Sequence, residues 1–234
     1  LSRFDHEIAI VTGGGSGIGE ATAKRLASEG AKVILVGRTK SKLEKVVSEI
    51  NENLNETRAF LYVCDVTSEE EVKGLVEYVE NEFGDVTVLV NSAGVLSYSM
   101  IRDMSFEEWK KIVQVNEDSV FLVSKYIGNL MKKCAESDQN KDRVIVNVAS
   151  ISGHKPGSLF PHYSAAKAST INLTKALAFE YGRSGIRVNS VSPGFVETPM
   201  IESSLQEEKM MKIIERKTLM RRVGKPDEIA VTVK

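Results

Sequence analysis

The chain has 234 residues, of which 42% are hydrophobic, 6% aromatic and 27% charged, values typical of a soluble globular domain with a full core. Its 31 basic and 32 acidic side chains leave a net charge of -1 at pH 7, so the charge balance favours neither a nucleic acid nor an anionic membrane as a partner. No apolar run reaches the roughly 20 residues that a membrane span needs.

The first three segments predict a strand, a glycine-rich turn and a helix. Residues 8–12 form a short apolar run of the kind found in strands that are buried on both faces. Residues 13–19 follow with the sequence GGGSGIG, and a helical pattern covers 20–28. Glycines at this junction permit positive φ and let a phosphate approach the backbone N–H groups of the helix N-terminus. We therefore predict a phosphate site here; the alternative is a glycine-rich turn that binds nothing.

The second strand is predicted over 32–37. In parallel sheets that bind a nicotinamide cofactor, the residue at the end of this strand distinguishes NAD(H) from NADP(H). A carboxylate at this point binds the adenosine ribose hydroxyls and repels a 2′-phosphate. This sequence has Gly37 instead, followed by Arg38, whose guanidinium offers a forked set of donors to a phosphate. We favour NADP(H) over NAD(H), with a solvated Arg38 that binds nothing as the alternative.

The remaining segments continue the alternation of strands and helices. We predict strands over 58–63, 85–90, 143–149 and 185–191, and helices over 40–53, 68–83, 105–133, 163–182 and from 226 onward. Residues 135–142 are expected to form an exposed loop, and 195–220 have only weak helical patterning. Six strands alternating with helices predict an α/β fold with a doubly wound parallel sheet in a single domain, 1–234.

Tyr163 and Lys167 form the motif that indicates chemistry. They are four residues apart on a predicted helix and so share one face. A phenol has an ordinary pKa of about 10, and a neighbouring ammonium favours the phenolate and lowers that value. Tyr163 is therefore a candidate general acid or base; the alternative is a partly buried tyrosine beside a solvated lysine.

Several motifs in order resemble the short-chain dehydrogenase/reductase family, and the resemblance covers nearly the whole chain. Residues 12–19 (TGGGSGIG) match its cofactor loop, and 163–167 (YSAAK) match its Y-x-x-x-K motif. Residues 91–94 (NSAG) match its N-N-A-G motif with one serine substitution. Ser150 stands thirteen residues before the tyrosine, which is the spacing usual for the catalytic serine of the family. The resemblance implies a Rossmann fold with a dinucleotide cofactor.

The resemblance also implies the roles of individual residues. Tyr163 exchanges a proton with the substrate oxygen, Ser150 hydrogen-bonds that oxygen, and Lys167 holds the nicotinamide ribose and lowers the Tyr163 pKa. Asn116 supports a water in a proton relay. The implied cofactor-binding residues are Gly13, Ser16, Gly17, Ile18, Gly19, Arg38, Asp65, Val66, Asn91, Ala93, Gly94, Tyr163, Lys167, Pro193, Gly194, Val196 and Thr198.

A substrate pocket is expected from residues 96–100, 153–162 and a substrate loop at about 195–222. His154 is the one obvious polar group there, and we expect a loop residue satisfied by water. The apolar lining favours a ketone, an aldehyde or a secondary alcohol with a hydrophobic body, an acyl thioester being one candidate. The candidate substrate residues are Ser150, Tyr98, His154, Phe160, Phe195 and Met200.

The function expected from these motifs is an NADP(H)-dependent carbonyl reductase, or the matching oxidation of a secondary alcohol, with Tyr163 as general acid or base. The alternatives are an NAD-dependent alcohol dehydrogenase and a non-catalytic dinucleotide-binding protein. A serine hydrolase is excluded because no G-x-S-x-G elbow surrounds Ser150. The resemblance implies a homodimer or homotetramer, paired through the helices that cover 109–133 and 163–182.

Two departures from the family pattern stand out. Glu117 and Asp118 directly follow Asn116, where the family usually has an apolar residue and often a glycine. We expect both carboxylates to face solvent; the alternative is that they perturb Tyr163. Family members also continue for two to three dozen residues beyond the position of Lys234, usually with a seventh strand, so either this sequence is a part of a longer protein or the last strand is missing.

The cysteines and histidines indicate no metal site. Cys64 and Cys134 offer neither a disulfide framework nor paired metal-ligand spacing, and both are expected to be small hydrophobic residues in a reducing compartment. Three scattered histidines provide no ligand set. We expect a cytoplasmic protein, with an organelle as the alternative if a leader precedes Leu1.

Overall fold

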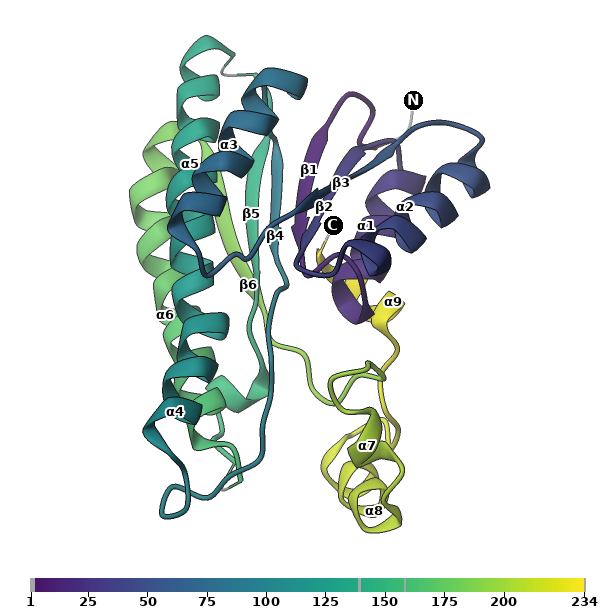
Figure 1. Cartoon of the computed structure of the whole chain (residues 1–234), viewed down its shortest axis with the longest axis vertical. Coiled ribbons are helices and arrows are strands. Elements are labelled where there is room, and N and C mark those ends of the chain that lie inside the picture. Colours follow the sequence, from purple (N-terminus) through teal and green to yellow (C-terminus); the bar gives the residue numbers. More distant parts are fainter. Residues whose placement is uncertain (1–2, 139, 158, 234) are drawn as a thin grey trace.

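A parallel sheet forms the centre of the protein in the computed structural model, which describes residues 3–138, 140–157 and 159–233 (Figure 1). Its strands are β1 (Ile8–Thr12), β2 (Lys32–Gly37), β3 (Ala59–Val63), β4 (Val88–Asn91), β5 (Arg143–Val148) and β6 (Ile186–Val191). They lie side by side in the order β3-β2-β1-β4-β5-β6, with the two edges at β3 and β6. The predicted doubly wound α/β sheet is confirmed.

Helices cover both faces of the sheet. The helices α1, α2 and α9 pack on one face, and α3, α5 and α6 pack on the other (Figure 1). Their bounds are α1 (Gly17–Ser28), α2 (Lys40–Leu54), α3 (Glu69–Phe83), α5 (Ser119–Ser137), α6 (Pro161–Tyr181) and α9 (Pro226–Val233).

The inner strands are largely apolar because side chains on both of their faces are buried. In β1, Ala9 and Val11 belong to the core under α1 and α2, whereas Ile10 belongs to the core under α3 and α5. All three side chains are fully buried. The inner strands are therefore held between two apolar layers, whereas the edge strand β6 exposes Arg187 and Asn189 to solvent.

The helix predicted over 105–133 is divided in the structure. It consists of α4 (Phe106–Val113), a π-helical turn (Gln114–Asp118) and α5. Helix α5 continues to Ser137, so the loop that was predicted from 135 begins three residues too early. Ala135 explains the error, because its buried side chain lets a polar-looking segment remain helical against the core.

The segment between β6 and α9 forms a small lobe that extends away from the sheet (Figure 1). It contains α7 (Glu202–Leu205) and α8 (Glu208–Lys217), where the sequence showed only weak helical patterning. A bridge between Val196 and Gly224 joins the two connections at the neck of this lobe. The backbone N–H of Glu197 donates to the Gly224 carbonyl at 2.9 Å.

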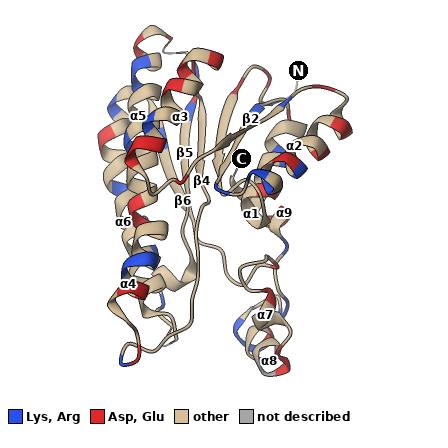
Figure 2. Ribbon diagram, viewed as in Figure 1, with Lys and Arg blue, Asp and Glu red and all other residues tan. Residues whose placement is uncertain are grey.

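Charged residues of both signs are interspersed along the helices (Figure 2). The strands carry few of them, since the core excludes unpaired charge. In the described part of the chain, no helix is both long enough and apolar enough to cross a bilayer.

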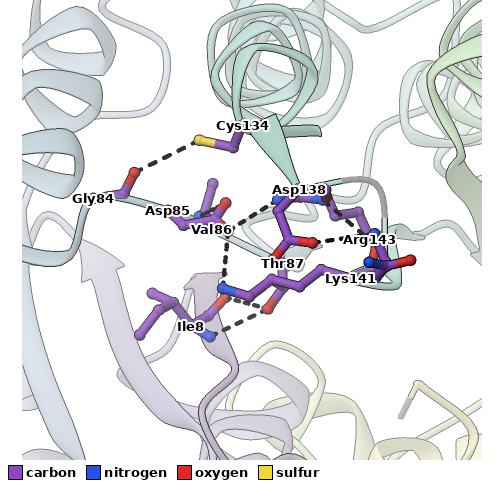
Figure 3. Close-up of polar contacts among 10 residues, drawn as sticks. Ile8, Gly84, Asp85, Val86, Thr87, Cys134, Asp138, Lys141 and Arg143 are labelled. Atoms are coloured by element: carbon purple, nitrogen blue, oxygen red, sulfur yellow. Dashed lines mark hydrogen bonds and ion pairs between the residues drawn. The ribbon is translucent and has the colours of Figure 1, made fainter. Parts of the chain in front are cut away.

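A buried ion pair fastens the amino ends of β4 and β5 (Figure 3). The Arg143 side chain is only 2% exposed, and its Nη2 lies 2.9 Å from Oδ2 of Asp85. Its Nη1 donates to the Asp138 carbonyl at 2.8 Å, beyond the end of α5. Lys141 adds a second cation, 3.2 Å from the same Asp85 oxygen. This cluster lies at the amino ends of the strands, opposite the end of the sheet where their carboxyl ends meet.

We predict that Asp85→Ala lowers the free energy of unfolding by roughly 3 kcal/mol, because it leaves a buried guanidinium without its counter-charge. Urea denaturation measures the change. Asp142→Ala is the matched control: the Asp142–Arg187 pair has exposed fractions of 71% and 56%, and removing such a pair costs about 0.5 kcal/mol. Equal losses in the two variants would show that burial adds nothing to the Asp85 pair.

Candidate active site

The glycine-rich loop between β1 and α1 presents bare backbone to a cavity. Gly13 and Gly17 have φ values of +68° and +56°, which glycine adopts without the steric cost of a side chain. A Cβ at position 19 would collide with the Gly13 carbonyl oxygen, so the turn packs tightly on the helix start. Ser16 precedes α1 without capping it through its hydroxyl. The first N–H groups of α1 are therefore available to an anionic group.

A second cavity adjoins the outer side of this loop. Its lining includes Gly37, Arg38 and Lys42 from the β2–α2 connection and Asp65 from the end of β3. Nη1 of Arg38 lies 3.8 Å from Oδ2 of Asp65. Oδ1 of Asp65 accepts hydrogen bonds from the backbone and the hydroxyl of Thr67 at 3.0 and 2.7 Å. Partial burial raises the Asp65 pKa, but the Thr67 hydrogen bonds and the Arg38 charge outweigh it and lower the pKa overall.

Ser150, Tyr163 and Lys167 line the first cavity together with the glycine-rich loop. Ser150 follows β5 and accepts a hydrogen bond from the Ser152 backbone at 3.1 Å. The other two residues lie one turn apart on α6, as their spacing predicts. Lys167 is buried, and its Nζ donates to the Val148 carbonyl at 2.8 Å.

Asn116 lies just behind this cavity, in the π-helical turn. Its side-chain nitrogen donates to the carbonyls of Val95 and Ile112 at 2.8 and 2.9 Å. A Cβ at Gly94 would lie 2.9 Å from Oδ1 of Asn116 and 3.8 Å from Nζ of Lys167. The bare backbone of Gly94 therefore separates the cavity from Asn116, and the structure brings all four predicted catalytic residues into one neighbourhood.

The π-helical turn also corrects the expectation for the two carboxylates after Asn116. Asp118 is exposed, as expected, but Glu117 is half-buried and accepts a hydrogen bond from the Ser169 hydroxyl at 2.7 Å. The extra residue in the turn rotates Glu117 toward α6, which an uninterrupted helical pattern does not predict.

Burial sets the proton affinities of the two residues of the Y-x-x-x-K motif. It raises the pKa of Tyr163, a nearby Tyr98 adds to the increase, and a hydrogen bond from Ser150 opposes it. Burial lowers the pKa of Lys167 to about 8. The expectation that Lys167 lowers the Tyr163 pKa is not met here. Nζ of Lys167 lies 5.7 Å from the centre of the Tyr163 ring and is engaged with a carbonyl.

Most of the predicted cofactor residues line one of the two cavities. Two do not: Gly19 packs on Gly13, and the side chain of Asn91 turns into the core. Its amide nitrogen donates to Ser124 and to Asn147, at 2.9 and 2.8 Å. The residues that do line a cavity are Gly13, Ser16, Gly17, Ile18, Arg38, Asp65, Val66, Ala93, Gly94, Tyr163, Lys167, Pro193, Gly194, Val196 and Thr198.

The predicted substrate residues also meet at the first cavity, with one exception. Tyr98, Phe160, Phe195 and Met200 line it beside Ser150. His154 lies outside this lining and is exposed. Its Nε2 is 3.1 Å from the Ser192 hydroxyl. Its hydrogen-bond partner is thus a protein side chain, whereas we expected water.

Sequence reasoning missed Ser204, a buried residue of α7. Its hydroxyl lies 3.0 Å from the Tyr98 hydroxyl, and the two residues are 106 positions apart. No motif marks a serine in a short helix as a partner of Tyr98, which lines the first cavity. Only the folded lobe brings it there.

Neither cysteine forms a disulfide in the structure. Within residues 3–138, 140–157 and 159–233, no group of three His, Cys, Asp or Glu side chains is arranged to hold a metal ion.

Known proteins resemble this chain over most of its length. A family model described as short chain dehydrogenase matches residues 7–209. A 3-oxoacyl-(acyl-carrier-protein) reductase of Thermotoga maritima is 36% identical over 233 residues, which cover 99% of this chain and 90% of the relative. A meso-2,3-butanediol dehydrogenase of Serratia marcescens is 34% identical over 232 residues, covering 99% and 87%. The crystal structure of a levodione reductase superposes with a TM-score of 0.91 at 32% identity, covering 99% of this chain and 90% of that one.

Proposed function

Because the chain belongs to the short-chain dehydrogenase/reductase family of nicotinamide-dependent oxidoreductases, we propose that it is an NADP(H)-dependent reductase of ketones or aldehydes. The same site would oxidise the matching secondary alcohol. The observation that carries this proposal is the convergence of Ser150, Tyr163 and Lys167 on the cavity that the glycine-rich loop also lines. The proposed dinucleotide site and the hydroxyl groups of Ser150 and Tyr163 thus face the same cavity.

The residues around the two cavities fit a dinucleotide. The loop from Gly13 to Ile18 and the start of α1 suit the pyrophosphate, because uncapped N–H groups and the helix dipole favour an anion. Asp65 and Val66 would adjoin the adenine. Lys167 would hold the nicotinamide ribose beside Gly94, while Pro193, Gly194 and Thr198 would hold the carboxamide. When bound, NADPH supplies the hydride.

Two hydroxyls would stabilise the charge that develops on the substrate oxygen. Ser150 donates a hydrogen bond to that oxygen, and Tyr163 donates its proton. The raised pKa of Tyr163 keeps the phenol protonated at neutral pH, which suits a proton donor and hence the reductive direction. Lys167 keeps its charge below about pH 8. Asn116 would hold the backbone around Val95 in place and support a water beside Lys167.

The substrate class follows from the lining of the cavity. Tyr98, Phe160, Phe195 and Met200 present an apolar wall to the two hydroxyls, so we assign a carbonyl compound with a hydrophobic body. The relatives named above, which act on 3-oxoacyl groups or butanediol, support a ketone or secondary alcohol. An acyl thioester remains within this class.

The preference for NADP(H) rests on the end of β2. Gly37 places no acid beside the adenosine ribose, and the Arg38 side chain is 59% exposed in the second cavity. Lys42 lines the same cavity. Oδ1 of Asp65 is hydrogen-bonded by Thr67, and Oδ2 lies 3.8 Å from Arg38, a loose pair that leaves guanidinium donors for a phosphate. Two cations beside one hydrogen-bonded carboxylate favour a 2′-phosphate.

We predict that Tyr163→Phe lowers kcat for carbonyl reduction by roughly 100-fold or more, because the variant lacks the proton donor. Its affinity for NADPH should stay within about twofold of the parent's. Steady-state kinetics and fluorescence titration with NADPH measure the two quantities. Tyr126→Phe, which alters a hydroxyl that contacts Glu69 between α5 and α3, is the control and should match the parent. Reduction by Tyr163→Phe at the parental rate would overturn the mechanism.

The cofactor preference has its own test. Arg38→Ala should weaken NADPH binding by about tenfold, the value of one charge-assisted hydrogen bond, and leave NADH binding within about twofold. Lys45→Ala removes an exposed charge elsewhere on α2 and serves as the control. A parent protein that prefers NADH would support the NAD-dependent alternative, and one that binds neither cofactor would contradict both.

We also propose that the protein pairs with a second copy through α5 and α6. Phe121 on α5 is 47% exposed and Phe179 on α6 is 79% exposed, although both are large apolar side chains. Sedimentation velocity at micromolar concentration should show a dimer or tetramer, and Phe179→Asp should shift the distribution toward the monomer. A monomeric parent would refute this proposal.

A further inference from the structure

A partly buried polar cluster adjoins the candidate active site, between α4 and the start of α6. His162 lies in the first turn of α6, directly before Tyr163, and its side chain is fully buried. Its Nε2 is 2.8 Å from the hydroxyl oxygen of Ser97. The same hydroxyl is 2.7 Å from Oε1 of Glu108 on α4. Three segments, the loop after β4, α4 and the start of α6, therefore meet at one serine.

The chemistry of the three groups fixes where the protons lie. The Glu108 carboxylate only accepts hydrogen bonds, so the single hydroxyl proton of Ser97 is directed to it. The Ser97 oxygen can then only accept from His162, which requires the proton of the neutral ring to be on Nε2. Nδ1 is left as a buried lone pair that forms no hydrogen bond with the described residues.

The ring is also kept neutral by its surroundings. Burial lowers the pKa of His162, and the opposing effects of Glu108 and the Phe160 backbone do not reverse that decrease. A neutral ring with a buried acceptor costs less than a buried cation that lacks a second partner. The hydrogen bonds of the cluster therefore run in one direction: His162 donates to Ser97, and Ser97 donates to Glu108.

This chain of hydrogen bonds holds one wall of the substrate cavity. Ser97 stands between Leu96 and Tyr98, which both line the cavity. The backbone N–H of Ser99 donates to the Leu159 carbonyl at 2.7 Å, a second link between the same two segments. The rings of Tyr98 and Phe160 are 5.9 Å apart. The wall is therefore fastened to the segment that leads into Tyr163.

We propose that His162 is a positioning residue for substrate binding: through Ser97 it holds the Tyr98 wall at a fixed distance from the Tyr163 hydroxyl. His162 does not line the cavity, so it acts only through its neighbours. The role rests on the proposed reductase function. It adds to that function a residue that no catalytic motif contains.

The proposal predicts a selective effect on substrate affinity. His162→Phe keeps a planar ring but removes the donor to Ser97, so KM for diacetyl or an acetoacetyl thioester should rise about fivefold or more while kcat changes by less than about twofold. Ser97→Ala should give the same result without altering the buried ring. His162→Gln, whose amide can donate from nearly the same place as Nε2, should restore KM. The NADPH dissociation constant should be unchanged in all three.

Glu107→Gln provides the matched control on α4. The side chain of Glu107 is 81% exposed and pairs with Lys110, so this variant should keep the parental KM. Glu108→Ala, one position further, should raise KM as Ser97→Ala does, because the Ser97 proton loses its acceptor.

Nitrogen-15 NMR of histidine-labelled protein tests the proton positions without any turnover. The His162 ring should be the neutral Nε2–H tautomer at pH 7. A proton on Nδ1, directed at the Phe160 backbone, would overturn the proposal, and so would a parental KM in both His162→Phe and Ser97→Ala. A parent that binds NADPH but neither reduces carbonyls nor oxidises secondary alcohols would instead overturn the proposed function, and the substrate role with it.

Discussion

The parallel direction of the strands is the constraint on which the site depends. Every strand of the sheet runs the same way, so all carboxyl ends lie on one side of the molecule. The residues that follow β1, β4 and β5 are brought together there. The glycine-rich loop, Gly94 and Ser150 are neighbours because β1, β4 and β5 are also adjacent in the sheet. At the opposite ends of the strands, the Arg143 cluster links the starts of β4 and β5 to the end of α5.

The features recognised from the sequence are those with short-range causes. Apolar runs predicted the strands because both faces of the sheet are buried, and the glycines of 13–19 predicted the turn because positive φ favours glycine at Gly13 and Gly17. The spacing of Tyr163 and Lys167 predicted one helix face. These patterns involve a few consecutive residues, and in the structure Ser150, Tyr163 and Lys167 line one cavity, with Asn116 behind it.

The features that the sequence did not predict arise from contacts between distant segments. Glu117 meets Ser169 because a π-helical turn rotates it. The Tyr163 pKa follows from burial by several elements, and a spacing rule based on Lys167 alone points the other way. The side-chain contacts of Ser97, His162 and Ser204 beside the first cavity join residues that are 65 or 106 positions apart in the sequence. Their importance becomes visible only when three or four segments are assembled.

The neck of the lobe has a consequence for how such a fold can diversify. The bridge between Val196 and Gly224 clamps the two connections together where they leave the sheet. Insertions, deletions or exchanges within α7 and α8 would therefore be absorbed beyond the clamp, without disturbing strand register or the hydroxyls at Ser150 and Tyr163. The lobe is a module in the evolutionary sense: its sequence can change while the positions of Ser150 and Tyr163 stay the same.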